Sequence, residues 1–214
     1  MPTVQQIITY ADRKYPNSES DANKIIDLND IHNNIFTIIS RLKNDYETYE
    51  TATIANQLTY TLPSKCQLSN IISIRVSASA TITTSTIWNE FEYAGFNEDV
   101  SRGYYWGRGL GNTIVLVEND LPLATAGLSI RITYYETPTQ LSSVTDTPEL
   151  DDYYHSLLKF GLIQELASQG QNPDTDIADY WQSKYDEFLN EVKKDLSEKN
   201  NAAPIGSAQI EEWW

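Results

Sequence analysis

The sequence predicts a mixed α+β fold, in which N- and C-terminal helices form a bundle and an antiparallel β domain is inserted between them. Apolar residues recur every three or four positions in residues 1–45 and again in residues 149–199, as in amphipathic helices. Residues 46–137 instead hold short runs rich in Thr, Tyr and Ile, separated by turn residues, which favours strands. Residues 138–148 form the expected linker, and residues 200–214 an extended C-terminal tail.

Two helices are predicted at the N-terminal end. The first begins at Thr3, a residue type that caps helices, and ends near Tyr15. The second covers about Asp21 to Asn44. Its apolar side chains lie on one stripe and are Ile25, Leu28, Ile31, Ile35, Ile39 and Leu42. An interruption of this helix is an alternative, because Asn29 or Asp30 can cap a new one.

The middle of the chain predicts an antiparallel sheet or a small sandwich. The expected strands are Tyr49–Thr53, Gln57–Leu62, Ile71–Val76, Ile87–Tyr93, Tyr104–Trp106, Thr113–Val117 and Leu128–Tyr134. The Gly-rich segment 107–112 predicts a hairpin turn between the fifth and sixth of these strands. The last strand alternates strictly between apolar and polar residues, which indicates one buried and one solvated face.

Two further helices are predicted after the linker, over about Glu149–Gln169 and Asp176–Lys199. The turn between them contains Pro173, and Asp174 or Thr175 is the expected N-cap of the second helix. Their apolar faces predict an antiparallel helix hairpin that packs against the N-terminal helices.

Composition limits the classes of function. The formal net charge of −15 repels phosphate, so tight DNA binding is not expected. This acidity is interpreted either as a soluble surface or as a wall past which DNA slides. Cys66 has no partner for an internal disulfide, which fits a reducing cytoplasm. We expect no signal peptide and no membrane segment, because no apolar run approaches about 18 residues.

Motifs for catalysis and for metal binding each have a simpler structural explanation. His32 and His155 lack the spacing of a zinc site. The segment Gly107–Gly111 lies between two expected strands and does not open a helix, so it is interpreted as a hairpin tip and not as a phosphate loop. Glu90 and Glu92 are expected on one solvated strand face, opposite Phe91 and Tyr93. The sequence thus predicts no enzyme, no metal and no cofactor.

Aromatic residues of the β domain are candidates for an interface. We assign this role to Tyr104, Tyr105 and Trp106, with an ordinary aromatic strand as the alternative. A competing hypothesis is a carbohydrate- or host-binding domain whose stacking surface is formed by Trp88, Tyr93, Tyr104, Tyr105 and Trp106. A third hypothesis, a cell-wall-cleaving enzyme, uses Glu90 or Glu92.

Two candidate surfaces come from the C-terminal part of the chain. Acidic residues of the last helix either form a solvated face or line a channel, and the channel candidates are Asp186, Glu187, Glu191 and Asp195. The tail carries an apolar group formed by Ile210, Trp213 and Trp214. These side chains either fold back onto the chain's own core or insert into a partner, and we favour the partner because Trp is enriched at binding hot spots.

The order of several short motifs resembles that of bacteriophage head-to-tail adaptors. The N-terminal part of the β domain contributes Leu58–Pro63 followed by Ile71–Val76, and the aromatic hairpin contributes Tyr104–Trp106 followed by Thr113–Leu116. The exit strand Ile132–Pro138 and the final helices, from Tyr153–Leu158 to Tyr180–Tyr185, continue the likeness. The resemblance covers roughly residues 1 to 200. The chain most resembles the larger, tail-tubular-like adaptors with an inserted β domain.

This resemblance implies a structural protein of the virion. Such proteins are expected to form a ring of twelve copies beneath the portal, to extend the DNA channel and to present a surface for tail or neck proteins. The genome passes through without specific binding. The resemblance further implies that Ala202–Trp214 is a docking arm for the portal, that the β domain faces outward or toward the tail, and that the protein is assembled in the host cytoplasm into the virion neck.

Overall fold

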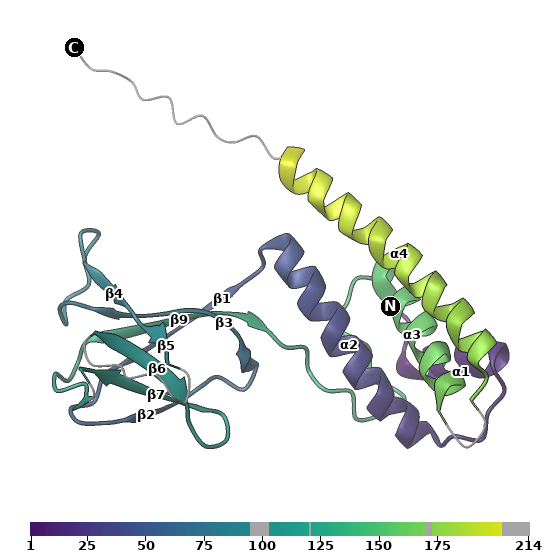
Figure 1. Cartoon of the computed structure of the whole chain (residues 1–214), viewed down its shortest axis with the longest axis horizontal. Coiled ribbons are helices and arrows are strands. Elements are labelled where there is room, and N and C mark those ends of the chain that lie inside the picture. The colour runs from purple at the N-terminus through teal and green to yellow at the C-terminus, as the bar shows by residue number, and fades with distance from the viewer. Residues whose placement is uncertain (95–102, 120, 170–172, 203–214) are drawn as a thin grey trace, which may run out of the picture. The chain divides into compact units, whose positions relative to one another are not determined.

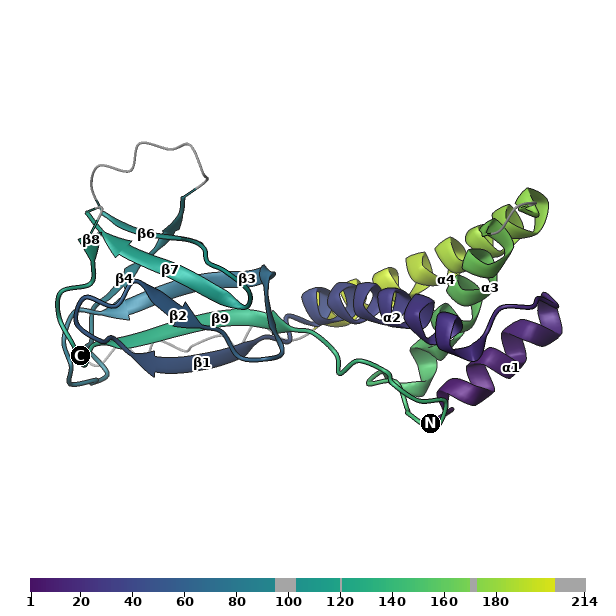
Figure 2. The same cartoon turned by 90° about the horizontal axis from the view of Figure 1, so that it is seen from below.

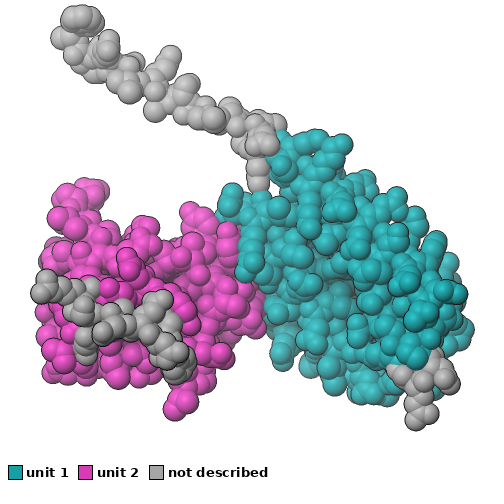
Figure 3. All heavy atoms as spheres, viewed as in Figure 1, with its two compact units in different colours: residues 1–44, 138–214 teal, residues 45–137 magenta. Residues whose placement is uncertain are grey.

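The computed structural model describes residues 1–94, 103–119, 121–169 and 173–202, and shows four α-helices and two β-sheets in these ranges (Figure 1). The chain divides into two compact units, coloured separately in Figure 3. The helical unit comprises residues 1–44 and 138–214, and the β unit comprises residues 45–137. The predicted α+β class is confirmed.

Helix α1 covers Val4–Lys14 and helix α2 covers Asp21–Lys43. The backbone N–H of Thr3 donates to the Gln6 side chain at 3.1 Å, as in a capping box. Helix α2 is continuous, so the alternative interruption is wrong. The Asn29 side chain instead donates to the carbonyl of Leu141 at 2.9 Å and accepts its N–H at 2.7 Å, which fixes the segment after the β unit to the middle of α2.

The C-terminal helices are α3, His155–Ser168, and α4, Thr175–Ala202. Asp174 is the N-cap of α4, because its carboxylate accepts the N–H of Ile177 at 3.1 Å. Helix α3 begins later than the predicted Glu149, after a short 3₁₀ turn, η1, at Asp152–Tyr154. Before this turn, Asp151 has a non-helical backbone, with φ −57° and ψ 145°, so the helix cannot continue back to Glu149.

The helical unit has one apolar core to which all four helices contribute. In the figure, α4 (yellow) runs alongside α3, and these two helices form the most extensive contact in the unit (Figure 1). The fully buried side chains include Ile7, Ile8, Leu28, Ile35, Leu157, Leu158, Leu162 and Val192. The predicted helix hairpin and its packing against the N-terminal helices are therefore confirmed.

The β unit is a two-sheet sandwich, and its strands are labelled in Figure 2, except for β5, which is labelled in Figure 1. One sheet has the order β1-β9-β3-β4, and the other has β2-β7-β6-β5 with β8 paired to β7. The bounds are β1 Glu47–Ala52, β2 Thr59–Thr61, β3 Cys66–Ser77, β4 Trp88–Glu90, β5 Glu92–Tyr93, β6 Tyr104–Arg108, β7 Thr113–Glu118, β8 Leu121–Pro122 and β9 Ser129–Glu136. Both sheets supply the core, with Ile74, Val76, Ile114, Leu116, Ile130 and Ile132 almost fully buried.

The predicted single strand Ile87–Tyr93 is wrong. Its residues form β4 and β5, which belong to different sheets, and the chain crosses between the sheets at Phe91. The crossing is fixed because the N–H of Phe91 donates to Ile74 of β3 and that of Ala94 donates to Trp106 of β6. Strands β5 and β6 are parallel, unlike the other strand pairs of the described residues.

Candidate functional site

The two histidines belong to the core of the helical unit. Each ring is 1% exposed. Burial lowers the pKa of His32 to about 4 and also lowers the pKa of His155, whose Nε2 lies 2.8 Å from the carbonyl oxygen of Leu150. Within the described ranges, no group of three or more His, Cys, Asp or Glu side chains is arranged to hold a metal ion. Burial raises the pKa of the Cys66 thiol to about 12, so this thiol stays protonated and unreactive at neutral pH.

The Gly-rich segment and the two glutamates of the β unit have structural roles. The predicted hairpin is confirmed, but strand β6 continues through Gly107 and Arg108, so the tip is shorter than predicted and comprises residues 109–112. Gly111 adopts a positive φ of 65° there. Glu90 forms an ion pair with Arg75 at 3.3 Å on one sheet, whereas Glu92 lies in β5 of the other sheet. The expectation that both glutamates share a face opposite Phe91 and Tyr93 is wrong, since Phe91 is buried and Tyr93 is 57% exposed.

Tyr104, Tyr105 and Trp106 do not form one surface. Side chains alternate along strand β6, so Tyr104 and Trp106 pack against the core, and Tyr105 lies on the opposite face. The Tyr104 ring contacts Phe91 edge-on at 5.3 Å between centroids, and its hydroxyl accepts a hydrogen bond from Asn89 at 3.3 Å. Burial is the main cause of the raised pKa of Tyr104, and the neighbouring Glu118 adds to it.

Trp88 lies on the other sheet, where a row of charged side chains crosses four strands. Glu50, Arg131, Arg75 and Glu90 occupy paired positions on β1, β9, β3 and β4. Ion pairs form at both ends of the row, between Arg131 and Glu50 at 2.6 Å and between Arg75 and Glu90 at 3.3 Å. The Arg131 guanidinium stacks over the Trp88 ring at 4.3 Å, so this ring face is covered by the protein itself.

The acidic candidates lie on α4. Glu187, Glu191 and Asp195 are spaced by four residues and therefore share one stripe of the helix, whereas Asp186 lies on the neighbouring stripe. We call Glu187, Glu191 and Asp195 the acidic stripe. Asp186 accepts a hydrogen bond from Gln182 at 3.0 Å, and Glu187 pairs with Lys184 at 2.7 Å. The Lys184 charge lowers the pKa of Glu187.

A row of aromatic rings crosses from η1 and α3 to α4, and the sequence interpretation missed it as a surface. Neighbouring ring centroids along the row are 5.3, 6.4, 5.4 and 5.3 Å apart, and the rings belong in order to Tyr153, Phe188, Phe160, Trp181 and Tyr180. We call these five residues the aromatic row. Its ends are exposed and its middle is half-buried. Spacings of seven residues, between Tyr153 and Phe160 and between Trp181 and Phe188, are the sequence signal that points to it.

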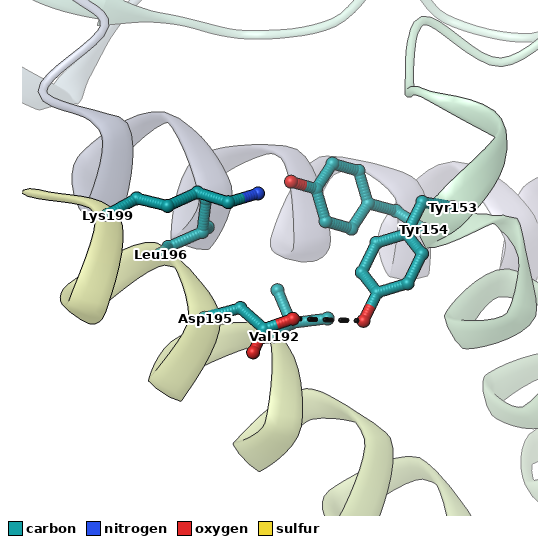
Figure 4. Close-up of a pocket in the computed structure, with 6 residues that line it drawn as sticks. All are labelled: Tyr153, Tyr154, Val192, Asp195, Leu196 and Lys199. Carbon is teal, nitrogen blue, oxygen red and sulfur yellow. Dashed lines mark hydrogen bonds between the residues drawn. The ribbon is translucent and has the colours of Figure 1, made fainter.

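The aromatic row meets the acidic stripe at a pocket of about 160 Å³ in the helical unit (Figure 4). Tyr153 and Tyr154 of η1 line one side, and α4 supplies the other side with Val192, Asp195, Leu196 and Lys199. The Tyr153 hydroxyl donates to Asp195 at 3.4 Å, drawn as a dashed line in Figure 4. Tyr153 has a raised pKa because of desolvation and the nearby charges of Glu191 and Asp195.

The predicted docking residues Ile210, Trp213 and Trp214 lie outside the described residues. Helix α4 extends to Ala202, past the predicted end at Lys199, and residues 203–214 follow it. The predicted tail of residues 200–214 is therefore corrected at its start, since residues 200–202 are helical, and from here on the tail means residues 203–214. No helix in the part of the chain that the structure describes is long and apolar enough to cross a bilayer.

Comparison with known proteins agrees with the motif order of the sequence. No curated protein matches the chain. The model of the SU10 adaptor protein family matches residues 2–208, which include all the helices and strands described above. The match spans nearly the whole chain, and it confirms the resemblance to phage head-to-tail adaptors. This protein belongs to the SU10 adaptor protein family.

Proposed function

We propose that this adaptor forms a ring beneath the portal of a tailed phage, extends the DNA channel and presents the surface to which the phage tail attaches. The observation that carries this proposal is the adaptor-family match over residues 2–208. The family is one of structural phage adaptors, so the chain is a component of the phage particle that interacts with other head or tail proteins. A ring of twelve copies follows from the resemblance to adaptors that dock under a dodecameric portal.

The two surfaces of the helical unit suit different neighbours in such a ring. The aromatic row combines exposed and half-buried rings, and aromatic side chains are enriched where proteins bind one another. We therefore assign it to the contact with the next copy. The acidic stripe adjoins this row through the Tyr153–Asp195 hydrogen bond and is assigned to the channel wall, where like charge keeps passing DNA from adhering.

The tail is assigned to the portal. The tail contains Pro204, Gly206 and Ser207 ahead of its apolar residues Ile210, Trp213 and Trp214. The apolar residues are therefore separated from the end of α4 by several residues of chain. Trp side chains in desolvated pockets are among the residues that contribute most to binding. Tail or neck proteins, and no membrane, complete the proposed partners in the virion neck.

Binding to portal-bearing capsids tests this function. The full chain is expected to bind such capsids, and a chain lacking residues 210–214 is expected to bind at least about tenfold more weakly, because truncation of a hot-spot Trp costs about 2 kcal/mol or more. The matched control replaces Glu211 and Glu212 by Gln, which keeps both Trp residues. Full-strength capsid binding by the shortened chain would rule out the docking arm.

The carbohydrate-binding hypothesis loses its stacking surface in this structure. Trp88 belongs to β4 of one sheet, whereas Tyr93, Tyr104, Tyr105 and Trp106 belong to the other sheet. Arg131 covers the Trp88 ring, and Tyr104 and Trp106 pack against the core. A sugar ring needs exposed aromatic faces on one surface, and these five residues do not supply it together.

A further inference from the structure

The pocket where the aromatic row ends has the size and the chemistry to hold one aromatic side chain. Its volume of about 160 Å³ matches that of protein cavities of about 150 Å³ that bind benzene. Two tyrosine rings and the aliphatic side chains of Val192 and Leu196 form its walls. The side chains of Asp195 and Lys199 complete the lining. Tyr153 is 48% exposed, so an incoming ring would cover part of it.

Polar groups at this pocket favour an indole flanked by negative charge. The Asp195 carboxylate accepts from Tyr153 and has a second oxygen that can accept an indole N–H. Lys199 lines the pocket, and the Lys43 ammonium lies 5.4 Å from the centre of the Tyr154 ring. Lys43 also pairs with Asp151 at 3.3 Å, so Lys199 is the main cation at the pocket and Lys43 adds to it. A pocket for an aromatic ring with cations beside it complements an acidic segment that ends in tryptophan.

The tail of this chain has that composition. Glu211 and Glu212 directly precede Trp213 and Trp214. The helix rises about 1.5 Å per residue, so Ala202 lies only about 10 Å along α4 from Asp195. The eleven residues from there to Trp213 span up to about 36 Å when extended, at about 3.3 Å each, which leaves ample length for the chain to turn back.

We propose that in the free protein the tail folds back onto its own helical unit, and that an indole of Trp213 or Trp214 fills the pocket between Tyr153 and Leu196. Glu211 and Glu212 then face Lys43 and Lys199. The regulatory part of this inference rests on the proposed function: the arm that binds the portal is held on the bundle until portal contacts replace the pocket. The same indole is thereby kept out of water before assembly.

Amide hydrogen exchange of the full-length chain tests the proposal. The tail amides are expected to exchange at least about tenfold more slowly than an unstructured peptide of the same sequence. Replacing Trp213 and Trp214 by Ala leaves the bundle intact and is expected to return residues 203–212 to the unstructured rate. Tyr153→Ala is expected to do the same from the pocket side. Tyr180→Ala, at the other end of the aromatic row, is the matched control and leaves the protection unchanged.

Three outcomes overturn the inference. Exchange of the wild-type tail at the unstructured rate shows that the pocket does not hold it. Protection that disappears on dilution assigns the tail to the pocket of a second copy. Protection that survives both Trp substitutions assigns it to another contact. None of these outcomes bears on the position of the protein in the virion, so the docking function and the fold-back contact fail separately.

Discussion

Lys24 of α2 places its ammonium 2.7 Å from the carboxylate of Asp12 on α1, and the Lys24 side chain is only 3% exposed. This ion pair joins the two helices, and only its Lys24 side is buried, since the Asp12 side chain is 38% exposed. A buried ammonium depends on its partner, since a charge without one is costly in an apolar setting. The pair therefore fixes how α1 lies on α2.

Removing the carboxylate is expected to cost more stability than removing the ammonium. Asp12→Asn leaves the Lys24 charge buried without its counter-ion and is predicted to lower the free energy of unfolding by about 2 kcal/mol, less than for a fully buried pair because water reaches Asp12. Lys24→Met removes the charge and keeps the apolar stem, so a smaller loss is expected. Urea unfolding followed by the helical circular-dichroism signal measures both, and a larger loss for Lys24→Met would contradict this account.

The stability of the helical unit is expected to fall with acidification between pH 6.5 and about 4. Burial lowers the pKa of His32 from 6.5 to about 4, so over this window the unfolded chain binds the proton and the folded chain does not. The contribution of the buried neutral His32 ring to the free energy of unfolding is fully present above pH 6.5 and is lost as the pH falls toward 4. Its size is on the order of 3 kcal/mol, because one pKa unit corresponds to about 1.4 kcal/mol.

The variant His32→Leu separates this effect from other titrations. The groups that act on the His32 ring are the Glu149 carboxylate, which opposes the shift, and His155, whose own pKa is lowered mainly by burial. The difference in unfolding free energy between wild type and His32→Leu is expected to change with pH across the window. A difference that stays constant from pH 7 to pH 4 would show that His32 titrates normally.

Gly161 lies where α3 approaches two other helices. A Cβ atom at this position would lie 3.0 Å from Ile31 Cγ2 of α2 and 3.5 Å from Tyr185 Cε2 of α4. Gly161→Val is predicted to lower the unfolding free energy by about 2 kcal/mol or more, because the added atoms force the helices apart. Gly161→Ala is expected to stay within about 1 kcal/mol of wild type, since the gain in helix propensity offsets the tight contact. Thermal unfolding of the two variants checks the order, and equal stability would contradict the close packing.

Charge reversal on the acidic stripe is expected to slow DNA ejection from assembled particles. Glu187→Lys with Glu191→Lys places positive charge where the proposed channel wall meets the phosphate backbone, and ejection is predicted to slow by at least about twofold. The control makes the same charge change at Glu47 and Glu92, two exposed glutamates of the β unit. DNA ejection at the wild-type rate from particles with the stripe variant would contradict the assignment of α4 to the channel wall.

The helices were largely predictable because their signals are local. The period of the apolar stripe of α2, the Asp174 cap and the alternation along β9 each depend on residues close in sequence, and the structure confirms them. The predicted start of α3 is too early, because Asp151 has a non-helical backbone that the helical pattern of the sequence does not reveal. In the continuous helix α2, the Asn29 side chain binds the distant Leu141 and does not cap a new helix, a contact that no local pattern shows.

The surfaces were less predictable, because they depend on which elements become neighbours. The alternation of side chains along a single strand predicts Glu90 and Glu92 on one face. The chain instead crosses between the two sheets at Phe91, so the two glutamates lie in different sheets. Tyr104, Tyr105 and Trp106 are adjacent in sequence, and for that reason they cannot share one face of a strand. Trp181 and Phe188 belong to the apolar face of the last helix. The structure shows them half-buried, in a row completed by residues from η1 and α3.

Electron microscopy of the phage neck tests the central claim most directly. The account predicts that this chain forms a closed ring between the portal and the tail, with twelve copies as the resemblance implies and with Glu187, Glu191 and Asp195 of α4 facing the central channel. Neck density without this chain, or its presence as separate copies at the tail surface, would contradict the assignment as a ring-forming adaptor.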